Sequence, residues 1–164
     1  VLAVASLDSP PVRREHIREG LSRTRWPGRL DEYRARRRTL LDGAHNPEAA
    51  RLLREFLIRE KEKDVHFVFG AVRDKNIRGI GREIFPLAAS IHLTPLSNTR
   101  SASPEDVAAM HRRLAPRMRI HAGMHEALRA AWEECPPSGL VVVTGSLYLV
   151  GELLPLVQAD ARNC

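Results

Sequence analysis

Apolar positions along most of the chain follow either strand-like or helix-like spacing. Residues 33–41 alternate in polarity and end in an apolar run, which is typical of a β-strand. The next segment, 46–61, repeats its apolar side chains at the period of a helix. Four of them share one helical face, namely Ala50, Leu53, Phe56 and Leu57. The two segments therefore predict a strand followed by an amphipathic helix.

The same order of strand and helix repeats four more times. We expect strands at 65–71, 90–93, 118–120 and 140–144, and helices at 77–87, 104–114, 124–134 and 147–157. Ser103 supports the helix at 104–114, because its hydroxyl can accept from an exposed backbone N–H and the carboxylate of Asp106, three residues later, suits the helix dipole. Short connections between such elements imply parallel strands joined by right-handed crossovers. The pattern predicts an α/β, Rossmann-like fold of three layers, with a mostly parallel sheet between helices.

The chain before this alternation has a different character. Residues 12–22 carry apolar and small residues at helical spacing, and residues 20–28 bring two glycines and a proline around Trp26. We expect a helix and then a linker, which divides the chain into a segment 1–30 and a domain 31–164. The chain starts on Val1 in an apolar run without an initiator methionine. We therefore expect a piece of a longer protein.

Composition favours a soluble protein with its own core. The chain has 164 residues, 43% of them hydrophobic, which is enough to bury a core. No apolar run approaches the roughly 18 to 20 residues of a membrane-spanning helix, and the apolar start lacks the flanks of a secretory signal. The two cysteines, Cys135 and Cys164, are too few for a disulfide framework and fit a reducing cytoplasm. We expect a cytoplasmic monomer with no membrane partner.

The net charge of +6 raises the question of a nucleic-acid partner. Ten arginines lie within residues 13–38, and Trp26 and Tyr33 offer rings on which bases can stack. Carboxylates interleave with these arginines, as on a solvated surface; they are Glu15, Glu19, Asp31 and Glu32. We therefore expect no nucleic-acid partner. A stand-alone module that binds an anion or nucleic acid remains an alternative.

In parallel sheets, ligands bind beyond the carboxyl ends of the strands, so the loops there carry the candidate chemistry. The loop at 41–47, Leu-Asp-Gly-Ala-His-Asn-Pro, follows a predicted strand and opens a helix. Asp42 can accept hydrogen bonds from a ribose or hold a cation. Asn46 and Pro47 suit the cap and first position of the helix. Capping needs no imidazole, which makes His45 a functional candidate, although the loop also fits an ordinary capped turn.

The loop at 69–76 also leaves an apolar strand and enters a predicted helix. It places two cations, Arg73 and Lys75, beside a helix N-terminus, where a carboxylate or phosphate can bind. The alternative is that Asp74 is only a helix cap and Lys75 is only solvated.

The loop at 144–148, Thr-Gly-Ser-Leu-Tyr, ends the most apolar predicted strand and begins a helix. Its hydroxyls, on Thr144, Ser146 and Tyr148, can bind a carboxylate together with free backbone N–H groups, although Gly-Ser is also a common turn pair. The chain contains no phosphate loop. Its Gly-Ile-Gly at 79–81 falls inside a predicted helix, which makes it a poor dinucleotide motif.

These motifs resemble, in order, those of the folylpolyglutamate and dihydrofolate synthases, a branch of the Mur ligase family. They comprise residues 25–30 (Arg-Trp-Pro-Gly-Arg-Leu), 41–47, 69–75 and 144–152. The Asp-Gly-Ala-His-Asn-Pro run is the most specific of them. The resemblance implies that 1–30 is the tail of a preceding ATPase domain with the interdomain linker, and that 31–164 is the C-terminal glutamate-ligase domain.

The family joins a carboxylate of folate or dihydropteroate to the amine of L-glutamate, using ATP to form an acyl phosphate and releasing ADP. The resemblance implies that Arg29 lies near the phosphates of ATP and Asp42 at its ribose, which suits a guanidinium and a carboxylate.

By the same resemblance, His45 is the candidate catalytic residue and also lines the glutamate side of the cleft, together with Ser146 and Tyr148. Lys75 or Arg73 matches a cation there. The Arg-Asp-Lys run departs from the Asp-Lys-Asp form common in the family, so the choice between these two cations stays open.

The phosphate loop, magnesium ligands and carbamylated lysine of the family belong to its N-terminal domain, and none has a counterpart in this chain. The resemblance therefore implies no metal ligand here, a need for ATP, magnesium and the N-terminal domain in cis, and no activity of this chain alone. A Mur peptidoglycan ligase is the alternative within the fold, and the Ala-His-Asn-Pro run argues against it. Whether the parent adds the first glutamate, later ones or both stays open, since folate selectivity resides in the absent domain.

Overall fold

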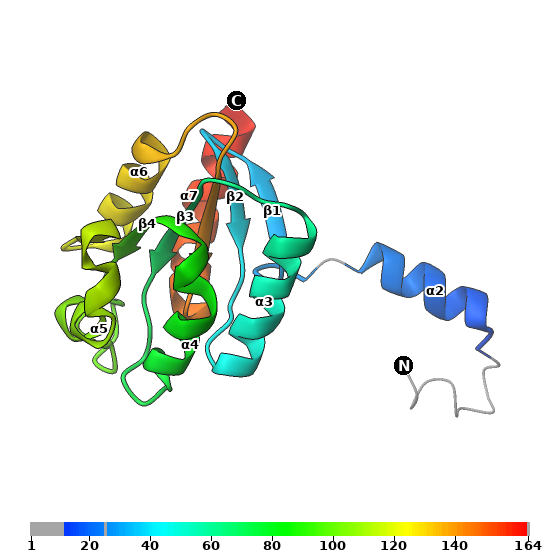
Figure 1. Cartoon of the computed structure of the whole chain (residues 1–164). Helices are drawn as coiled ribbons and strands as arrows, with labels where there is room; N and C mark the ends of the chain where they lie inside the picture. The colour runs from blue at the N-terminus through cyan, green and yellow to red at the C-terminus, as the bar shows by residue number, and fades with distance from the viewer. Residues whose placement is uncertain (1–11, 25, 164) are drawn as a thin grey trace.

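The computed structural model describes residues 12–24 and 26–163, where six strands form one sheet between two layers of helices (Figure 1). The strands are β1 (Asp31–Arg34), β2 (Arg38–Leu41), β3 (Val65–Phe69), β4 (Ala88–Leu93), β5 (Met118–Ile120) and β6 (Leu140–Thr144). The helices are α2 (Arg14–Arg23), α3 (Pro47–Arg59), α4 (Ile77–Ile84), α5 (Pro104–Met110), α6 (Met124–Glu134) and α7 (Leu147–Asn163), with 3₁₀ turns η1 (Phe85–Leu87) and η2 (Arg112–Arg117). The predicted α/β class with a mostly parallel sheet is confirmed.

The strand order is β1-β2-β6-β3-β4-β5, and every neighbouring pair is parallel except β1 with β2. The prediction of one strand over 33–41 was wrong, because the chain turns back at Ala35–Arg37 and forms an antiparallel hairpin. The alternation of polarity runs through this turn without a glycine, proline or asparagine to mark it. The carboxylate of Asp160 accepts from the Arg36 backbone N–H at 2.5 Å and so holds the turn against α7.

Two apolar cores lie on opposite faces of the sheet. Side chains of α3, α4 and α5 fill one with Phe67 and Phe69, and side chains of α6 and α7 fill the other with Val68. All five residues of β6 are buried, as its uninterrupted apolar run predicted. Cys135 belongs to the second core, where burial raises the pKa of its thiol to about 11, so the thiol stays protonated.

Several helices differ from their predicted extents. The helix predicted at 77–87 ends at Ile84, because Pro86 has no N–H to continue the ladder, and a 3₁₀ turn follows. The helix predicted at 104–114 stops at Met110 and also gives way to a 3₁₀ turn. The last helix continues past its predicted end at 157 and reaches Asn163. The apolar pattern stops at Val157, the last buried residue of the helix, and so does not mark the final turns. The caps were predicted correctly: Asn46 accepts from Ala49 N and Ser103 from Asp106 N.

The N-terminal helix α2 stands away from the sheet and its helices (Figure 1). It begins two residues later than the predicted helix and has no buried residue. Residues 1–11, Arg25 of the linker motif and Cys164 lie outside the described residues. None of the described helices combines the length and the apolar character needed to cross a membrane.

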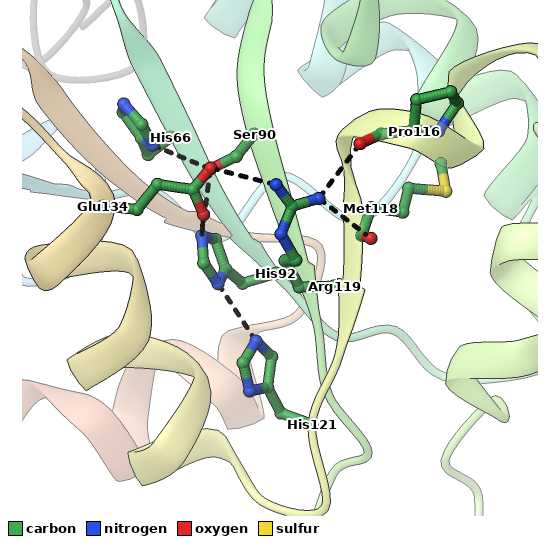
Figure 2. Close-up of polar contacts among 8 residues, drawn as sticks. All are labelled: His66, Ser90, His92, Pro116, Met118, Arg119, His121 and Glu134. Carbon is green, nitrogen blue, oxygen red and sulfur yellow. Dashed lines mark hydrogen bonds and ion pairs between the residues drawn. The ribbon is translucent and has the colours of Figure 1, made fainter.

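A buried polar network crosses β3, β4 and β5 beneath α6 (Figure 2). His66 Nδ1 lies 2.7 Å from Ser90 Oγ, which lies 2.9 Å from His92 Nε2. The other nitrogen of His92, Nδ1, lies 3.0 Å from His121 Nε2. Glu134 of α6 approaches His92 Nε2 at 3.3 Å. The chain of contacts lets these buried polar atoms satisfy one another.

The surroundings of this network disfavour charged imidazoles. Burial lowers the pKa of His92 to about 3, and the charges of His121, His66 and Arg119 act in the same direction. Burial also lowers the pKa of His66, against the carboxylates of Glu134 and Asp64. Since a histidine of the unfolded chain titrates near 6.5, the unfolded state binds protons at pH values where the folded state does not. The stability contributed by neutral His66 and His92 is therefore complete above that pH and is lost as the pH falls.

We expect the free energy of unfolding to fall by up to about 1.4 kcal/mol per pH unit on account of His92, between about pH 6.5 and pH 5. His92→Leu should make this dependence shallower, because the titrating group is gone. His125→Gln, which changes an exposed histidine of α6, serves as the control and should keep the wild-type slope. Urea denaturation at several pH values measures the slopes, and an unaltered slope in His92→Leu would contradict the assignment.

Candidate functional site

The carboxyl ends of β2, β6 and β3 are joined by backbone hydrogen bonds. The N–H of Gly145 donates to the Ala44 carbonyl at 3.0 Å, which links the loop after β6 to the loop after β2. The N–H of Gly70 donates to the Thr144 carbonyl at 3.4 Å, which links β6 to β3. The loops selected from the sequence therefore start side by side at one edge of the sheet.

Two glycines make this close approach possible. A Cβ on Gly43 would lie 2.2 Å from Leu147 Cδ2, so a larger residue there would have to displace the Leu147 side chain at the start of α7. Gly145 has a φ of +103°, which disfavours other residues, and a Cβ there would lie 2.7 Å from the Gly70 carbonyl oxygen. Glycine at 145 thus lets the loop after β6 lie directly against the backbone at the end of β3.

Asp42 fixes the linker to the end of β2. Its Oδ2 accepts from the Leu30 N–H and its Oδ1 from the Ala44 N–H, both at 3.0 Å. The side chain is 7% exposed, and burial raises its pKa, while the two backbone donors and the charge of Arg29 oppose that rise. Leu30 adopts a left-handed φ of +47°, a conformation that costs a non-glycine residue about 1 kcal/mol or more. The bond from Asp42 stabilises this strained turn.

Arg29 and Asp42 share a pocket of about 230 Å³ between the linker and α3. Ala49, Leu52 and Leu53 form its apolar wall, and Leu52 is 53% exposed. The guanidinium and the carboxylate therefore lie at an apolar surface. A planar, partly apolar ligand with hydroxyl and anionic groups finds partners for each part there.

His45 is half-buried and held by its own loop. Its Nδ1 lies 2.9 Å from the Gly43 carbonyl oxygen. Because a carbonyl only accepts, Nδ1 carries the proton, and Nε2 of the neutral ring keeps its lone pair. His45 therefore presents an acceptor nitrogen in the neutral form and a donor in the charged form.

Ser146 is buried and caps α7. Its Oγ accepts from the Tyr148 backbone N–H at 3.1 Å, while none of the described residues accepts from its O–H. Tyr148 itself is 56% exposed in the first turn of the helix. The structure thus has the hydroxyls of Ser146 and Tyr148 at the end of β6, as the sequence predicted. The cap that Ser146 forms on α7 was not predicted.

The two cations of the loop after β3 behave differently. The guanidinium of Arg73 donates to the Thr99 carbonyl, and the Arg73 backbone N–H donates to the Arg100 carbonyl at 2.9 Å. Asp74 pairs with Arg100 at 2.6 Å, whereas the N-cap of α4 is Asn76. The side chain of Lys75 is exposed, and its ammonium makes no hydrogen bond or ion pair within the described part of the chain. Arg73 is thus bound to the loop after β4 by both its side chain and its backbone.

The sequence named the hydroxyl of Thr144 but could not show its surroundings: Oγ1 is buried and has no hydrogen-bond partner among the described residues. A second feature of this edge was missed in the sequence. Ser97, in the loop after β4, donates to Glu152 of α7 at 2.5 Å. Residues 55 positions apart give no local signal of contact, so only the fold brings this pair together. Within the described ranges, no group of three His, Cys, Asp or Glu residues is placed to hold a metal ion.

The family model described as dihydrofolate synthetase, C-terminal domain, matches residues 31–156. The chain belongs to this family. The resemblance drawn from the sequence motifs is confirmed. The matched residues include the loops after β2, β3 and β6, which form the candidate site of this dihydrofolate synthetase C-terminal domain.

Curated relatives carry related names. A probable bifunctional folylpolyglutamate synthase/dihydropteroate synthase of Haloferax volcanii is 33% identical over 144 residues, covering 87% of this chain and 17% of the relative. A folylpolyglutamate synthase of Lacticaseibacillus casei is 29% identical over 140 residues, covering 85% of this chain and 31% of the relative. The chain thus spans less than a third of the length of these two relatives.

Solved structures of the family share the fold. A Yersinia pestis bifunctional folylpolyglutamate synthase/dihydrofolate synthase complexed with AMPPNP and Mn ion has a TM-score of 0.84 and 29% identity, covering 96% of this chain and 37% of that one. A bifunctional folylpolyglutamate synthase/dihydrofolate synthase with Mn, AMPPNP and L-glutamate bound gives a TM-score of 0.81. A Mycobacterium tuberculosis folylpolyglutamate synthase complexed with ADP gives 0.82 at 25% identity. The dihydrofolate synthetase C-terminal domain therefore matches part of enzymes that bind nucleotide and glutamate.

We expect Asp42→Ala to lower the free energy of unfolding of this chain by about 2 kcal/mol, because two backbone donors lose a charged acceptor. Asp42→Asn keeps one oxygen acceptor and should cost less. Glu48→Ala, in which an exposed carboxylate of α3 is lost, is the control and should change little. Chemical denaturation measures all three, and wild-type stability in Asp42→Ala would refute the clamp.

Proposed function

We propose that the chain is the C-terminal, glutamate-binding half of an ATP-dependent, ADP-forming ligase that adds glutamate to folate or dihydropteroate through an acyl phosphate. The observation that carries the proposal is the locked edge of the sheet. There, the pocket of Arg29 and Asp42 adjoins the loop of His45, which is hydrogen-bonded to the loop after β6. Such an edge offers a nucleotide side and an amino-acid side within one cleft.

Asp42 and Arg29 form the nucleotide side. Each carboxylate oxygen has two lone pairs and uses one for a backbone N–H, so a ribose hydroxyl can still donate to Asp42. The exposed guanidinium of Arg29 suits the phosphates. The apolar wall from α3 offers a surface for the base. The relatives crystallised with AMPPNP or ADP support this assignment.

His45 and the start of α7 form the glutamate side. The fixed tautomer leaves Nε2 of His45 able to take a proton from the incoming amine. The amine nitrogen then attacks the acyl carbon, and phosphate leaves with the bonding electrons. Ser146 holds the N-terminus of α7, and its O–H together with Tyr148 and Lys75 supplies donors for the carboxylates of glutamate. Arg73, which is bound to the Thr99 carbonyl, is the weaker candidate of the two cations.

The remaining chemistry falls to the domain that precedes this one in the family. ATP and magnesium supply the phosphoryl group and its charge neutralisation, and the magnesium ligands lie mostly on the N-terminal ATPase domain. The relative with Mn, AMPPNP and L-glutamate bound supports this requirement. Helix α2, with no buried residue of its own, is the end of that domain in our proposal. The linker then brings Arg29 to the cleft in cis.

The folate assignment is favoured over a peptidoglycan ligase because the matching family model is that of dihydrofolate synthetase, and because the relatives above are folate enzymes. Some relatives are named for both dihydrofolate synthase and folylpolyglutamate synthase activity. We propose a cytoplasmic, monomeric enzyme that acts on small molecules, with no nucleic-acid or membrane partner.

In a full-length ligase that carries this chain, substitutions on the two sides should separate kinetically. Arg29→Ala should raise the KM for ATP by about tenfold through loss of a charge-assisted contact, and leave glutamate dependence nearly unchanged. His45→Ala should raise the KM for glutamate or slow amide formation, and leave ATP dependence unchanged. Each variant is the control for the other in steady-state kinetics. Ser146→Ala should also lower the melting temperature, because the cap of α7 is lost.

The outcome that would sink these roles is a pair of variants that lose stability and show wild-type dependence on both substrates. Melting temperatures measured beside the kinetics distinguish this outcome from a selective defect.

The 164-residue chain alone should release no ADP in the presence of ATP, magnesium, L-glutamate and dihydropteroate or folate, because its sequence has no phosphate loop. A full-length ligase that carries the chain should release ADP in a glutamate-dependent reaction when it is given the same substrates. Ion-pair chromatography measures the ADP. Glutamate-dependent turnover by the purified chain, free of contaminating ligase, would overturn the claim that the chain is half of an active site.

A further inference from the structure

A second, larger pocket lies away from the strand ends, between α4 and the segment formed by α5 and η2. It has a volume of about 890 Å³. Arg78 and Arg82 of α4 line one side, and Arg112 and Arg113 of η2 line the other. No aspartate or glutamate lines it, and the remaining wall is largely apolar, with Pro86 and Met110 among its residues. We call this pocket the arginine groove.

The four guanidiniums of the arginine groove have no hydrogen bond or ion pair within residues 12–24 and 26–163. Other arginines of the same chain do find carboxylates: Arg38 pairs with Glu32 and Glu62, and Arg51 with Glu48 and Glu55. The groove is therefore a local exception and not a general feature of a basic protein.

The carboxylate of α4 does not relieve this charge. Glu83 lies 4.0 Å from Arg54 of α3, so it faces the neighbouring helix and does not line the groove. Arg78 and Arg82 are one helical turn apart and share a face, where like charges destabilise a helix. Four uncompensated cations around one pocket cost stability unless an anion lies between them.

His111, which also lines the groove, has a ring nitrogen that is likewise without a partner among the described residues. The ring of His111 packs edge-on against Phe85, with 5.0 Å between the centroids, and its Nε2 is buried without a hydrogen-bond partner among the described residues. A Cβ on Gly81 would lie 2.4 Å from that nitrogen, so glycine is what lets the ring sit there. Burial lowers the pKa of His111, the charges of Arg78 and Arg82 act in the same direction, and a hydrogen bond with the Ile77 backbone opposes them. The imidazole in the wall of the groove therefore favours its neutral form.

The composition of the groove selects its ligand. Guanidiniums bind carboxylates and phosphates through paired N–H donors. The volume is in the range of small-molecule sites, so it exceeds what a single anion fills. No Phe, Tyr or Trp lines the groove, so it lacks the stacking platforms typical of single-stranded nucleic acid sites. The matching ligand is a flexible small molecule that carries several anionic groups separated by apolar links.

We propose that the arginine groove binds a γ-linked oligoglutamate, the chain that the proposed ligase would extend, with its carboxylates on the four arginines and its methylene groups on the apolar wall. This inference rests on the proposed function for the source of the ligand. Arg78 lies in the first turn of α4, immediately after the loop that carries Lys75. Met110 lines both the groove and a smaller pocket that contains Arg73. One end of the groove, at Arg78, is therefore three residues along the chain from Lys75, the proposed glutamate contact, so a growing tail can pass from one to the other.

Isothermal titration of the 164-residue chain with penta-γ-L-glutamate, L-glutamate and inorganic tripolyphosphate tests the proposal. The pentamer should bind at least about tenfold more tightly than the monomer, because several carboxylates engage at once. The double variant Arg78→Gln/Arg82→Gln should weaken pentamer binding by at least about tenfold. Arg112→Gln/Arg113→Gln should do the same from the opposite wall. Circular dichroism establishes that each variant is folded.

The matched control is Arg129→Gln/Arg162→Gln, which removes the same charge from exposed positions of α6 and α7 on the other face of the sheet. It should change pentamer binding less than about twofold, because these two arginines do not line the groove. If attraction to the net charge alone held the pentamer, this variant would weaken binding as much as the groove variants do. Equal weakening by the control, or no binding of the pentamer, would overturn the proposal. Groove-dependent binding of tripolyphosphate without binding of the pentamer would also overturn it and assign the groove to a phosphate ligand. None of these measurements uses ATP or turnover, so they fail independently of the proposed ligase activity.

Discussion

The candidate site depends on one buried carboxylate. Asp42 accepts from two backbone N–H groups that are far apart in the local path of the chain, one in the linker and one in the loop after β2. This pair of bonds sets the linker against the sheet edge, holds Leu30 in its strained turn and brings Arg29 to the pocket. The interaction costs desolvation of the carboxylate, as the raised pKa shows. Because burying the Asp42 carboxylate costs free energy, we infer that the position of the linker it holds is important for the site.

Much of the fold could be read from the sequence because the central strands β3 and β6 are buried on both faces. The apolar runs of β3 and β6 announce a parallel sheet, and the caps at Asn46 and Ser103 mark where helices begin. The hairpin of β1 and β2 could not be read, because its turn uses arginines instead of turn-forming residues. Its geometry comes from Asp160, more than a hundred positions away. Long-range contacts of this kind leave no local pattern.

The same distinction applies to the site. Strand ends and their polar residues were predictable, since the positions follow from alternation of elements. The partner of each side chain was not. Arg73 looked equivalent to Lys75 in the sequence, yet its side chain binds the Thr99 carbonyl, and the helix cap formed by Ser146 could not be foreseen beside its predicted role as a ligand donor. The arginine groove combines residues of α4, η1, α5 and η2, which only meet in the folded chain. The residue types in the sequence identify candidate side chains, but the partner of each side chain is known only from the packing of the fold.

The two edge strands have a consequence for how the molecule behaves in a crowded solution. An open sheet edge is a template onto which another chain can add a strand. Here β1 at one edge is only Asp-Glu-Tyr-Arg, and β5 at the other is only Met-Arg-Ile. Both are short, and each carries charge that an added strand would have to desolvate. The sheet therefore resists growth by strand addition, which protects against aggregation and leaves the loops as the surfaces for specific recognition.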